Sequence, residues 1–192
     1  KKNIKIKILP INNKGEINLN DFKNLLTKKT KLVSVLHVSN AIGSILPIKE
    51  LISISHKKKV PVLIDGCQSV PHMEVDLKDL NPDFYCFSGH KIYGPTGIGI
   101  LYCKNEILEK MSPYQGGGEM ISNVTFEKTT YQEPPYKFEA GTPNIVGAIA
   151  LGSAIDYVDK INLKKIYKHE QELLLYATQK IECINDLQII GT

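Results

Sequence analysis

The chain has 192 residues, a formal net charge of +4, 42% hydrophobic residues and 23% charged residues, which is the profile of a globular protein. No apolar run approaches the roughly 18–20 residues that span a bilayer, and no basic stripe is interleaved with aromatics, so the sequence favours neither a membrane nor a nucleic-acid partner. The four cysteines match no CxxC or zinc spacing, so we expect no metal site and infer a reducing compartment.

The first half of the chain alternates predicted strands and helices. Residues 4–9 alternate isoleucine and lysine as a strand does, and Asp21 to Lys29 predict a short helix capped by Asn20. Pro47 is expected to open a second helix. Four apolar runs predict strands at residues 32–38, 60–66, 83–88 and 97–104. This alternation favours an α/β fold with a mostly parallel sheet flanked by helices.

The second half has a different texture. Residues 112–143 are rich in proline, glycine and aromatics with little periodicity, which predicts a long functional loop. A helix is expected from Asn144 onward, and residues 163–183 predict an amphipathic helix. Its apolar face is formed by Ile166, Leu173, Leu174, Ala177 and Ile181. Residues 187–192 resemble the start of a further strand.

Polar side chains follow three of the predicted strands. They are His37, Ser39 and Asn40 after the first, Asp65 and Gln68 after the second, and Ser88, His90 and Lys91 after the third. In an open α/β sheet, ligands bind outside the carboxyl ends of the strands. If these strands are parallel neighbours, their polar groups meet at one edge and form a candidate site.

Asp65 ends a strand that is predicted to be buried on both faces. A buried carboxylate is costly unless it is paired. Two interpretations stay open at this point: a cap or salt bridge to a neighbouring segment, and a fixed negative charge that faces a cationic ligand atom such as a pyridinium nitrogen.

Lys91 lies in the stretch FSGHKIYGPTGIGILY, between the end of an apolar strand and a turn forced by glycine and proline. A surface lysine is the ordinary interpretation. A lysine held at such a strand end is instead desolvated, which lowers its pKa and frees the amine to attack a carbonyl. Ser88 and His90 are then well placed to hydrogen-bond an anion such as a phosphate, although a lone histidine is more often a structural donor.

Taken together, these groups match one cofactor. A carboxylate, an imine-forming lysine and a hydroxyl–imidazole pair are what pyridoxal 5'-phosphate (PLP) requires at its ring nitrogen, aldehyde and phosphate. The run DGCQSVPHMEVDLKDLNPDFYCFSGHKIYGPTGIGILY (65–102), with HVSNAIG (37–43), GGGEMI (116–121) and FEAGTPN (138–144), closely resembles the group II, SufS-type cysteine desulfurases. These belong to the class V aminotransferase-like PLP enzymes of fold-type I.

The resemblance implies roles for individual residues. Lys91 corresponds to the Schiff-base lysine, which afterwards carries a proton between the substrate Cα and the cofactor. Asp65 corresponds to the partner of the pyridine nitrogen. It also implies that residues 1–160 are part of a large PLP-binding domain and that residues 161–192 begin a small C-terminal α+β domain.

The other cofactor contacts follow in the same way. Gln68 and Asn40 correspond to residues on the ring-hydroxyl side, and Ser88 and His90 to residues of the phosphate cup. Thr142 corresponds to a threonine that reaches the phosphate of the partner subunit, which implies a homodimer with shared sites. Without the resemblance, Thr142 reads as a plain turn residue.

The implied reaction removes sulfur from L-cysteine, leaves L-alanine and a persulfide on the enzyme, and supplies iron–sulfur cluster assembly through an acceptor of the SufE or SufU type. Selenocysteine is a plausible second substrate. Relatives imply the bacterial cytosol or a plastid-type organelle. The alternatives are another class V PLP enzyme, such as a kynureninase-like hydrolase or an aminotransferase, and an inactive PLP-fold scaffold.

Three parts that the resemblance implies are expected outside residues 1–192: a ring-stacking histidine before them, and the persulfide cysteine and a carboxylate-binding arginine after them. The sequence contains no arginine. The chain is therefore interpreted as the central part of a longer enzyme, and by itself it could lack PLP and activity.

Overall fold

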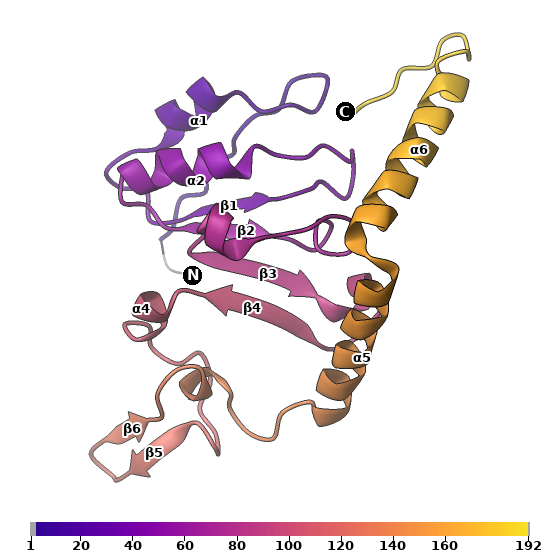
Figure 1. Cartoon of the computed structure of the whole chain (residues 1–192). Coiled ribbons are helices and arrows are strands. Elements are labelled where there is room, and N and C mark those ends of the chain that lie inside the picture. Colours follow the sequence, from indigo (N-terminus) through magenta and orange to yellow (C-terminus); the bar gives the residue numbers. More distant parts are fainter. Residues whose placement is uncertain (1–2, 192) are drawn as a thin grey trace.

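The protein is an α/β structure built on a four-stranded sheet, seen in a computed structural model that describes residues 3–191. The strands follow the chain in the order β1-β2-β3-β4 (Figure 1). They are β1 Val33–Leu36, β2 Val62–Asp65, β3 Phe84–Ser88 and β4 Gly99–Cys103. The first three are parallel, so the predicted α/β fold with a mostly parallel sheet is confirmed. Strand β4 runs antiparallel, because only residues 89–98 join it to β3 and a parallel crossover needs a longer connection.

The main core lies between the sheet and α2 (Ile48–Lys57). This helix begins after Pro47, as predicted, and buries Ile48, Leu51, Ile52 and Ser55 at helical spacing. Leu51 packs with Val62 and Ile64 of β2, and all three are fully buried. Helix α2 and the sheet therefore form two packed layers, and their contact fixes the position of β2.

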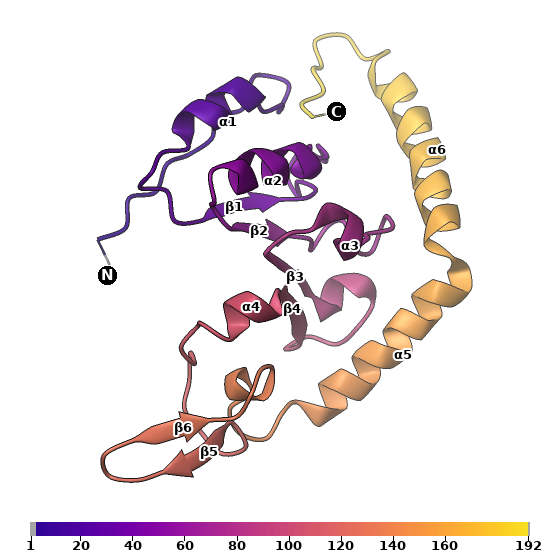
Figure 2. The same cartoon turned by 60° about the vertical axis from the view of Figure 1, so that its left-hand side comes forward.

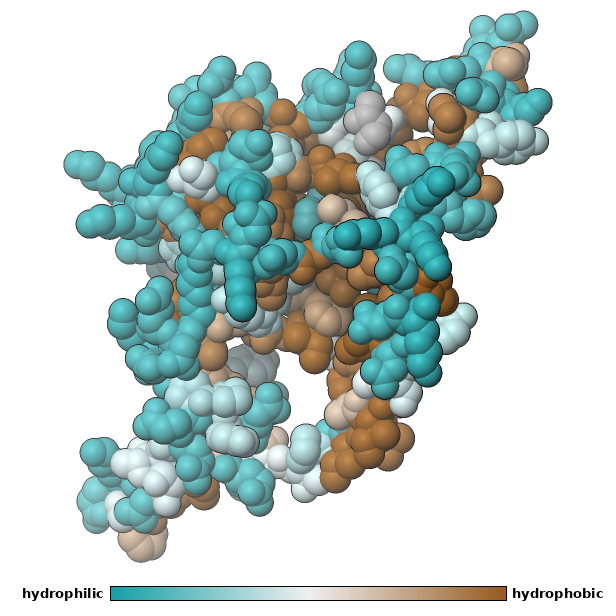
Figure 3. All heavy atoms as spheres, in the orientation of Figure 1, coloured by the Kyte–Doolittle hydropathy of each residue, from teal (hydrophilic) through white to brown (hydrophobic). Residues whose placement is uncertain are grey.

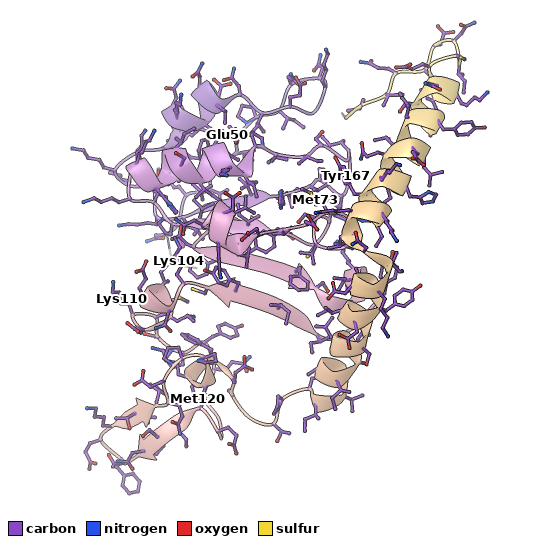
Figure 4. The ribbon with its side chains drawn as sticks, viewed as in Figure 1. Glu50, Met73, Lys104, Lys110, Met120 and Tyr167 are labelled. Atoms are coloured by element: carbon purple, nitrogen blue, oxygen red, sulfur yellow. The ribbon has the colours of Figure 1, made fainter. Side chains whose placement is uncertain are left out.

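A buried carboxylate, Asp83, ties this core together at the edge where the parallel strands begin. Its Oδ2 accepts hydrogen bonds of 2.7 Å from His56 Nε2 and 2.7 Å from the Val62 backbone N–H. Its Oδ1 lies 3.3 Å from Lys104 Nζ. Figure 4 shows Lys104 at the end of β4, which lies beside the start of β3 and therefore at the opposite edge from the carboxyl ends of β1 to β3.

The first helix is shifted from its predicted position. Helix α1 spans Leu19–Leu25, and its N-cap is Asn18, whose side chain accepts the Asn20 N–H at 2.8 Å. Asn20 is therefore a helical donor and the predicted cap is wrong. The helix ends before Lys29 because Thr27 and Thr30 close a turn of their own, with Thr30 N–H donating to Thr27 O at 3.0 Å.

Both predicted terminal strands are wrong within the described residues. Residues 4–9 pair with no strand, and Ile4, Ile6 and Ile8 are exposed. Residues 187–191 are irregular, and residue 192 lies outside the described part of the chain. Alternation of side chains predicts which residues share a face, but a strand also needs a neighbour to take its backbone hydrogen bonds.

The predicted loop of residues 112–143 contains a small hairpin. Strand β5 (Ile121–Val124) pairs antiparallel with β6 (Thr129–Tyr131), apart from the main sheet (Figure 1). Met120, at the base of the hairpin, is fully buried. Besides the short helices α3 (Leu77–Leu80), α4 (Asn105–Leu108), η1 (Gly89–Ile92) and η2 (Tyr136–Phe138), two long helices complete the fold.

These long helices are α5 (Ile145–Ile161) and α6 (Leu163–Ile181), and they stand along the edge where β1 to β3 end (Figures 1 and 2). Helix α5 is capped by Asn144, as expected for a helix that begins there, and buries Leu151 and Val158 against Ile92 of η1. Asn162 alone joins the two helices at φ +79°. Its N–H donates to Val158 O and its side chain accepts the Lys164 N–H, at 3.0 Å each.

Helix α6 is confirmed, but its predicted apolar face is not buried within residues 3–191. Leu173 and Leu174 are 54% and 58% exposed. Figure 3 shows a further apolar surface over the first turns of α5, where Val146 is 79% exposed. No helix in the described residues is long and apolar enough to cross a membrane. The predicted division of the chain after residue 160 stays a prediction, and the helical break falls close to it.

Candidate active site

The carboxyl ends of β1, β2 and β3 meet at one edge, as the sequence predicts. Leu36, Asp65 and Cys86 stand side by side in the register of the three strands. The segments that follow these residues carry the predicted polar side chains. Their convergence on one edge follows from the parallel pairing of neighbouring strands.

Asp65 is half-buried at the last position of β2. Its Oδ1 accepts the Cys67 backbone N–H at 2.9 Å, which closes a tight turn directly after the strand. The carboxylate also interacts with the Cys67 thiol, and it forms no salt bridge with another described residue. The predicted cap is thus present, and the negative charge has no cationic partner among residues 3–191.

Lys91 is half-buried in η1, the single helical turn after β3. The neighbouring Ile92 anchors this turn in the cluster that it shares with α5. Gly94 N–H donates to Gly89 O at 2.9 Å, and a Cβ at Gly94 would crowd that same oxygen. The glycines around the lysine therefore allow the chain to fold back tightly, and Lys91 has no acidic partner among residues 3–191.

Both charged groups affect the pKa of the Cys67 thiol. Burial raises the pKa of this thiol most, the Asp65 carboxylate raises it further, and the Ser88 backbone and the Lys91 ammonium lower it. Independently of these charges, Asp65 lies opposite Cys86 in the register of β2 and β3, and Lys91 follows β3 in η1. The carboxylate and the amine therefore belong to the same edge of the sheet.

Ser88 and His90 form a pair beside the lysine. Ser88 Oγ lies 2.7 Å from His90 Nδ1, with Ser88 half-buried and His90 exposed. A hydroxyl and an imidazole held together in this way can donate hydrogen bonds to an anion. The donor set of Asp65, Lys91, Ser88 and His90 fits the ring nitrogen, aldehyde and phosphate of PLP.

The remaining predicted residues are less closely tied to this group. Gln68 is half-buried in the turn that follows Asp65, and Asn40 is exposed in the segment after β1. Thr142 is exposed just before α5. None of these three side chains hydrogen-bonds another described residue, so their assigned roles stay predictions.

Sequence reasoning missed a series of buried hydrogen-bonded side chains next to the site. His37, expected at the strand edge, is instead 5% exposed, and its Nδ1 lies 3.0 Å from the hydroxyl of Tyr85. That hydroxyl lies 2.6 Å from Ser69 Oγ. A tyrosine inside a buried strand needs a partner for its hydroxyl, and this was the available signal.

The other thiols are poorly suited to nucleophilic attack. Burial raises the pKa of Cys86 and of Cys103, with further increases from Asp65 and Asp83 respectively. Nucleophilic cysteines need an accessible thiolate, which a lowered pKa supplies. Cys183 is exposed, and it follows the last turn of α6.

Comparison with known proteins identifies the family. The model of the aminotransferase class-V family matches residues 1–192. The chain is 49% identical over 187 residues to a cysteine desulfurase of Cronobacter sakazakii, covering 97% of this chain and 46% of the relative. It is 48% identical over 188 residues to a cysteine desulfurase of Synechococcus elongatus, covering 98% and 30%.

A solved structure agrees with these relatives. The crystal structure of the cysteine desulfurase CsdA from Escherichia coli superposes with a TM-score of 0.87 at 36% identity, over 92% of this chain and 44% of that one. The chain thus spans less than half the length of the proteins it matches. With the strand order, the edge site and these matches in agreement, the chain belongs to the aminotransferase class-V family, whose members depend on PLP.

Proposed function

We propose that the full-length protein is a PLP-dependent cysteine desulfurase that converts L-cysteine into L-alanine and an enzyme-bound persulfide. One observation carries the proposal: Asp65 ends β2 at the same sheet edge where β3 runs into η1, which holds Lys91 and the Ser88–His90 pair. The relatives named cysteine desulfurase, at 49% and 48% identity, support this reaction over others in the family.

Each residue has a defined task in this proposal. Lys91 would hold the cofactor at its aldehyde, and its amine would carry the proton taken from the substrate Cα. Asp65 would pair with the pyridine nitrogen, and Ser88 and His90 would bind the phosphate. When bound, PLP supplies an electron sink for the bond that breaks. Gln68 and Asn40 would lie on the ring-hydroxyl side, and Thr142 would reach the phosphate bound by a second subunit.

Finer features belong to the same proposal. The SufS-type sequence motifs support a role in iron–sulfur cluster assembly, a SufE- or SufU-type sulfur acceptor, and location in the cytosol or a plastid-type organelle. The exposed apolar start of α5 supports a homodimer. Burial raises the pKa of Cys67, Cys86 and Cys103, which disfavours these three thiols as the persulfide nucleophile.

The reaction is tested by assaying the full-length protein, loaded with PLP, on L-cysteine and on L-kynurenine. We expect L-alanine and reducible sulfur in equal amounts from cysteine and no L-alanine from kynurenine. L-Alanine from kynurenine alone would identify a kynureninase-like hydrolase. Bound PLP without turnover of either substrate would leave the scaffold interpretation.

Asp65→Asn is expected to lower the desulfuration rate by about 100-fold, because a neutral amide no longer favours a protonated ring nitrogen. Part of the PLP should stay bound, since Lys91, Ser88 and His90 are unchanged. Steady-state rates and the bound PLP per chain measure the two effects. Asp156→Asn, at an exposed position of α5, is the control. Equal rates for both variants would show that the Asp65 carboxylate is only structural.

A further inference from the structure

We infer that Tyr85 is a positioning residue, whose buried hydroxyl acts through Ser69 to hold the turn that directly follows Asp65. The consequence for the reaction rests on the proposed function, whereas the restraint on the turn does not. Tyr85 is the second residue of β3 and is only 2% exposed, so its hydroxyl is closed to a ligand from solvent.

Three hydrogen bonds in series link the residue after β1, strand β3 and the turn. His37 Nδ1 lies 3.0 Å from Tyr85 Oη, Tyr85 Oη lies 2.6 Å from Ser69 Oγ, and Ser69 Oγ lies 3.0 Å from the Gly66 carbonyl oxygen. His37 and Ser69 are 48 and 16 residues from Tyr85 along the chain. The series therefore closes only when the strands are paired, and it ends on the residue next to Asp65.

The acceptor at the end of this series fixes the direction of every bond. The Gly66 carbonyl can only accept, so the single hydroxyl proton of Ser69 points toward it. Ser69 Oγ must then accept from Tyr85, and the Tyr85 oxygen must accept from His37. The proton of the neutral His37 ring is consequently on Nδ1.

Charge does not disturb this direction near neutral pH. Burial above all, with smaller contributions from the Asp65 carboxylate and the Cys86 and Cys67 thiols, raises the pKa of Tyr85 to about 12. Burial also lowers the pKa of His37 below its ordinary 6.5. The phenol therefore keeps its proton and the imidazole stays neutral.

Gly66 makes room for the tyrosine. A Cβ at this position would overlap the ring and the hydroxyl of Tyr85. The Gly66 N–H donates to Cys86 O at 2.8 Å, and its carbonyl accepts the N–H groups of Ser69 and Val70 at 3.1 Å each. The phenol thus lies directly against the backbone of the turn. Its hydroxyl completes the hydrogen bonds of this turn, in which the Cys67 N–H donates to the Asp65 carboxylate and orients it.

The test removes only the hydroxyl. Tyr85→Phe in the full-length protein keeps the ring against Gly66. The control is Tyr102→Phe, because Tyr102 is paired with Tyr85 across β3 and β4, is half-buried, and has no side-chain hydrogen bond to another described residue. Without PLP, backbone amide hydrogen exchange over residues 66–70 should become about ten-fold faster in Tyr85→Phe and should not change in Tyr102→Phe.

Two further measurements separate positioning from general loosening. Exchange over residues 33–36 should stay the same in both variants, and the dissociation constant for PLP should rise about ten-fold in Tyr85→Phe alone. Ser69→Ala should reproduce both effects, and the double variant should add little, because the two side chains belong to one series. Nitrogen-15 NMR of His37 in the unmodified protein should find the proton on Nδ1.

The outcomes are distinct. Unchanged exchange over residues 66–70 in both Tyr85→Phe and Ser69→Ala would overturn the inference, and so would a His37 proton on Nε2. Neither measurement uses cysteine. Faster exchange in a protein that fails to release sulfur would therefore uphold the positioning role of Tyr85 and contradict the proposed function.

Discussion

Lys91→Ala in the full-length protein is expected to abolish the visible absorption of bound PLP and to lower the desulfuration rate by about 1,000-fold or more. The substitution removes the amine that η1 holds directly after β3, at the sheet edge where Asp65 ends β2. It leaves the fold intact, because Lys91 forms no salt bridge with another described residue and Ile92 provides the packing of this turn. Absorption spectra and alanine production from L-cysteine measure the two losses.

The matched control is Lys110→Ala, which removes an exposed lysine just after α4 (Figure 4). It should leave the spectrum and the rate unchanged. If Lys91→Ala kept both the absorption and the turnover of the unmodified protein, the assignment of the reactive amine would be wrong, and with it the proposed mechanism.

The largest loss of stability is expected from Asp83→Ala, which should lower the free energy of unfolding by about 3 kcal/mol. The substitution leaves His56, the Val62 N–H and Lys104 without their shared acceptor at the start of β2 and β3. Urea denaturation of the full-length protein, followed by circular dichroism, measures the change. The activity per folded molecule should stay the same, since the cluster lies at the opposite edge from the candidate site.

The comparison variant is Asp79→Ala. Asp79 also pairs with a lysine, at 2.6 Å from Lys49 Nζ, but both side chains are about 60% exposed. Its loss should cost about 0.5 kcal/mol or less, because water screens an exposed pair. Equal losses for the two variants would contradict the importance given to burial at Asp83.

The pH dependence gives the same cluster an independent signature. Burial by itself would raise the pKa of Asp83, but hydrogen bonds from His56 and the Val62 N–H, with the charges of His56 and Lys104, outweigh it, so the pKa lies below its ordinary 3.8. A lowered carboxyl pKa stabilises the fold fully above the unfolded value, and this contribution is lost as the pH falls through the folded value. Stability should therefore fall less steeply below about pH 3.8 in Asp83→Ala than in the unmodified protein.

Much of the fold can be predicted from the sequence, because burial leaves a local pattern. The four strands and the helices that begin after Pro47 and Asn144 follow from apolar runs and start signals. The direction of β4 and the absence of a strand at residues 4–9 do not, because both depend on which partner is within reach. Strand pairing is a property of the assembled sheet rather than of any one segment.

The candidate site divides in the same way. Asp65 and Lys91 could be found because each stands where an apolar strand stops, and strand order then brings them together. The inward turn of His37 and its bond to Tyr85 could not, because those residues lie 48 positions apart and nothing near either one in the sequence points to the other.

Asn162 gives the two long helices a stiff joint. One residue ends α5 and starts α6, with its backbone bonded to the first helix and its side chain to the second. Helix α5 packs on Ile92, next to Lys91, and α6 is linked to the segment after Asp65, with His72 Nδ1 2.8 Å from Glu170 Oε1. Figure 4 labels Met73 in that segment and Tyr167 on α6. Because a single residue joins α5 and α6, a displacement of α6 would bear both on η1, which carries Lys91, and on the segment that follows Asp65.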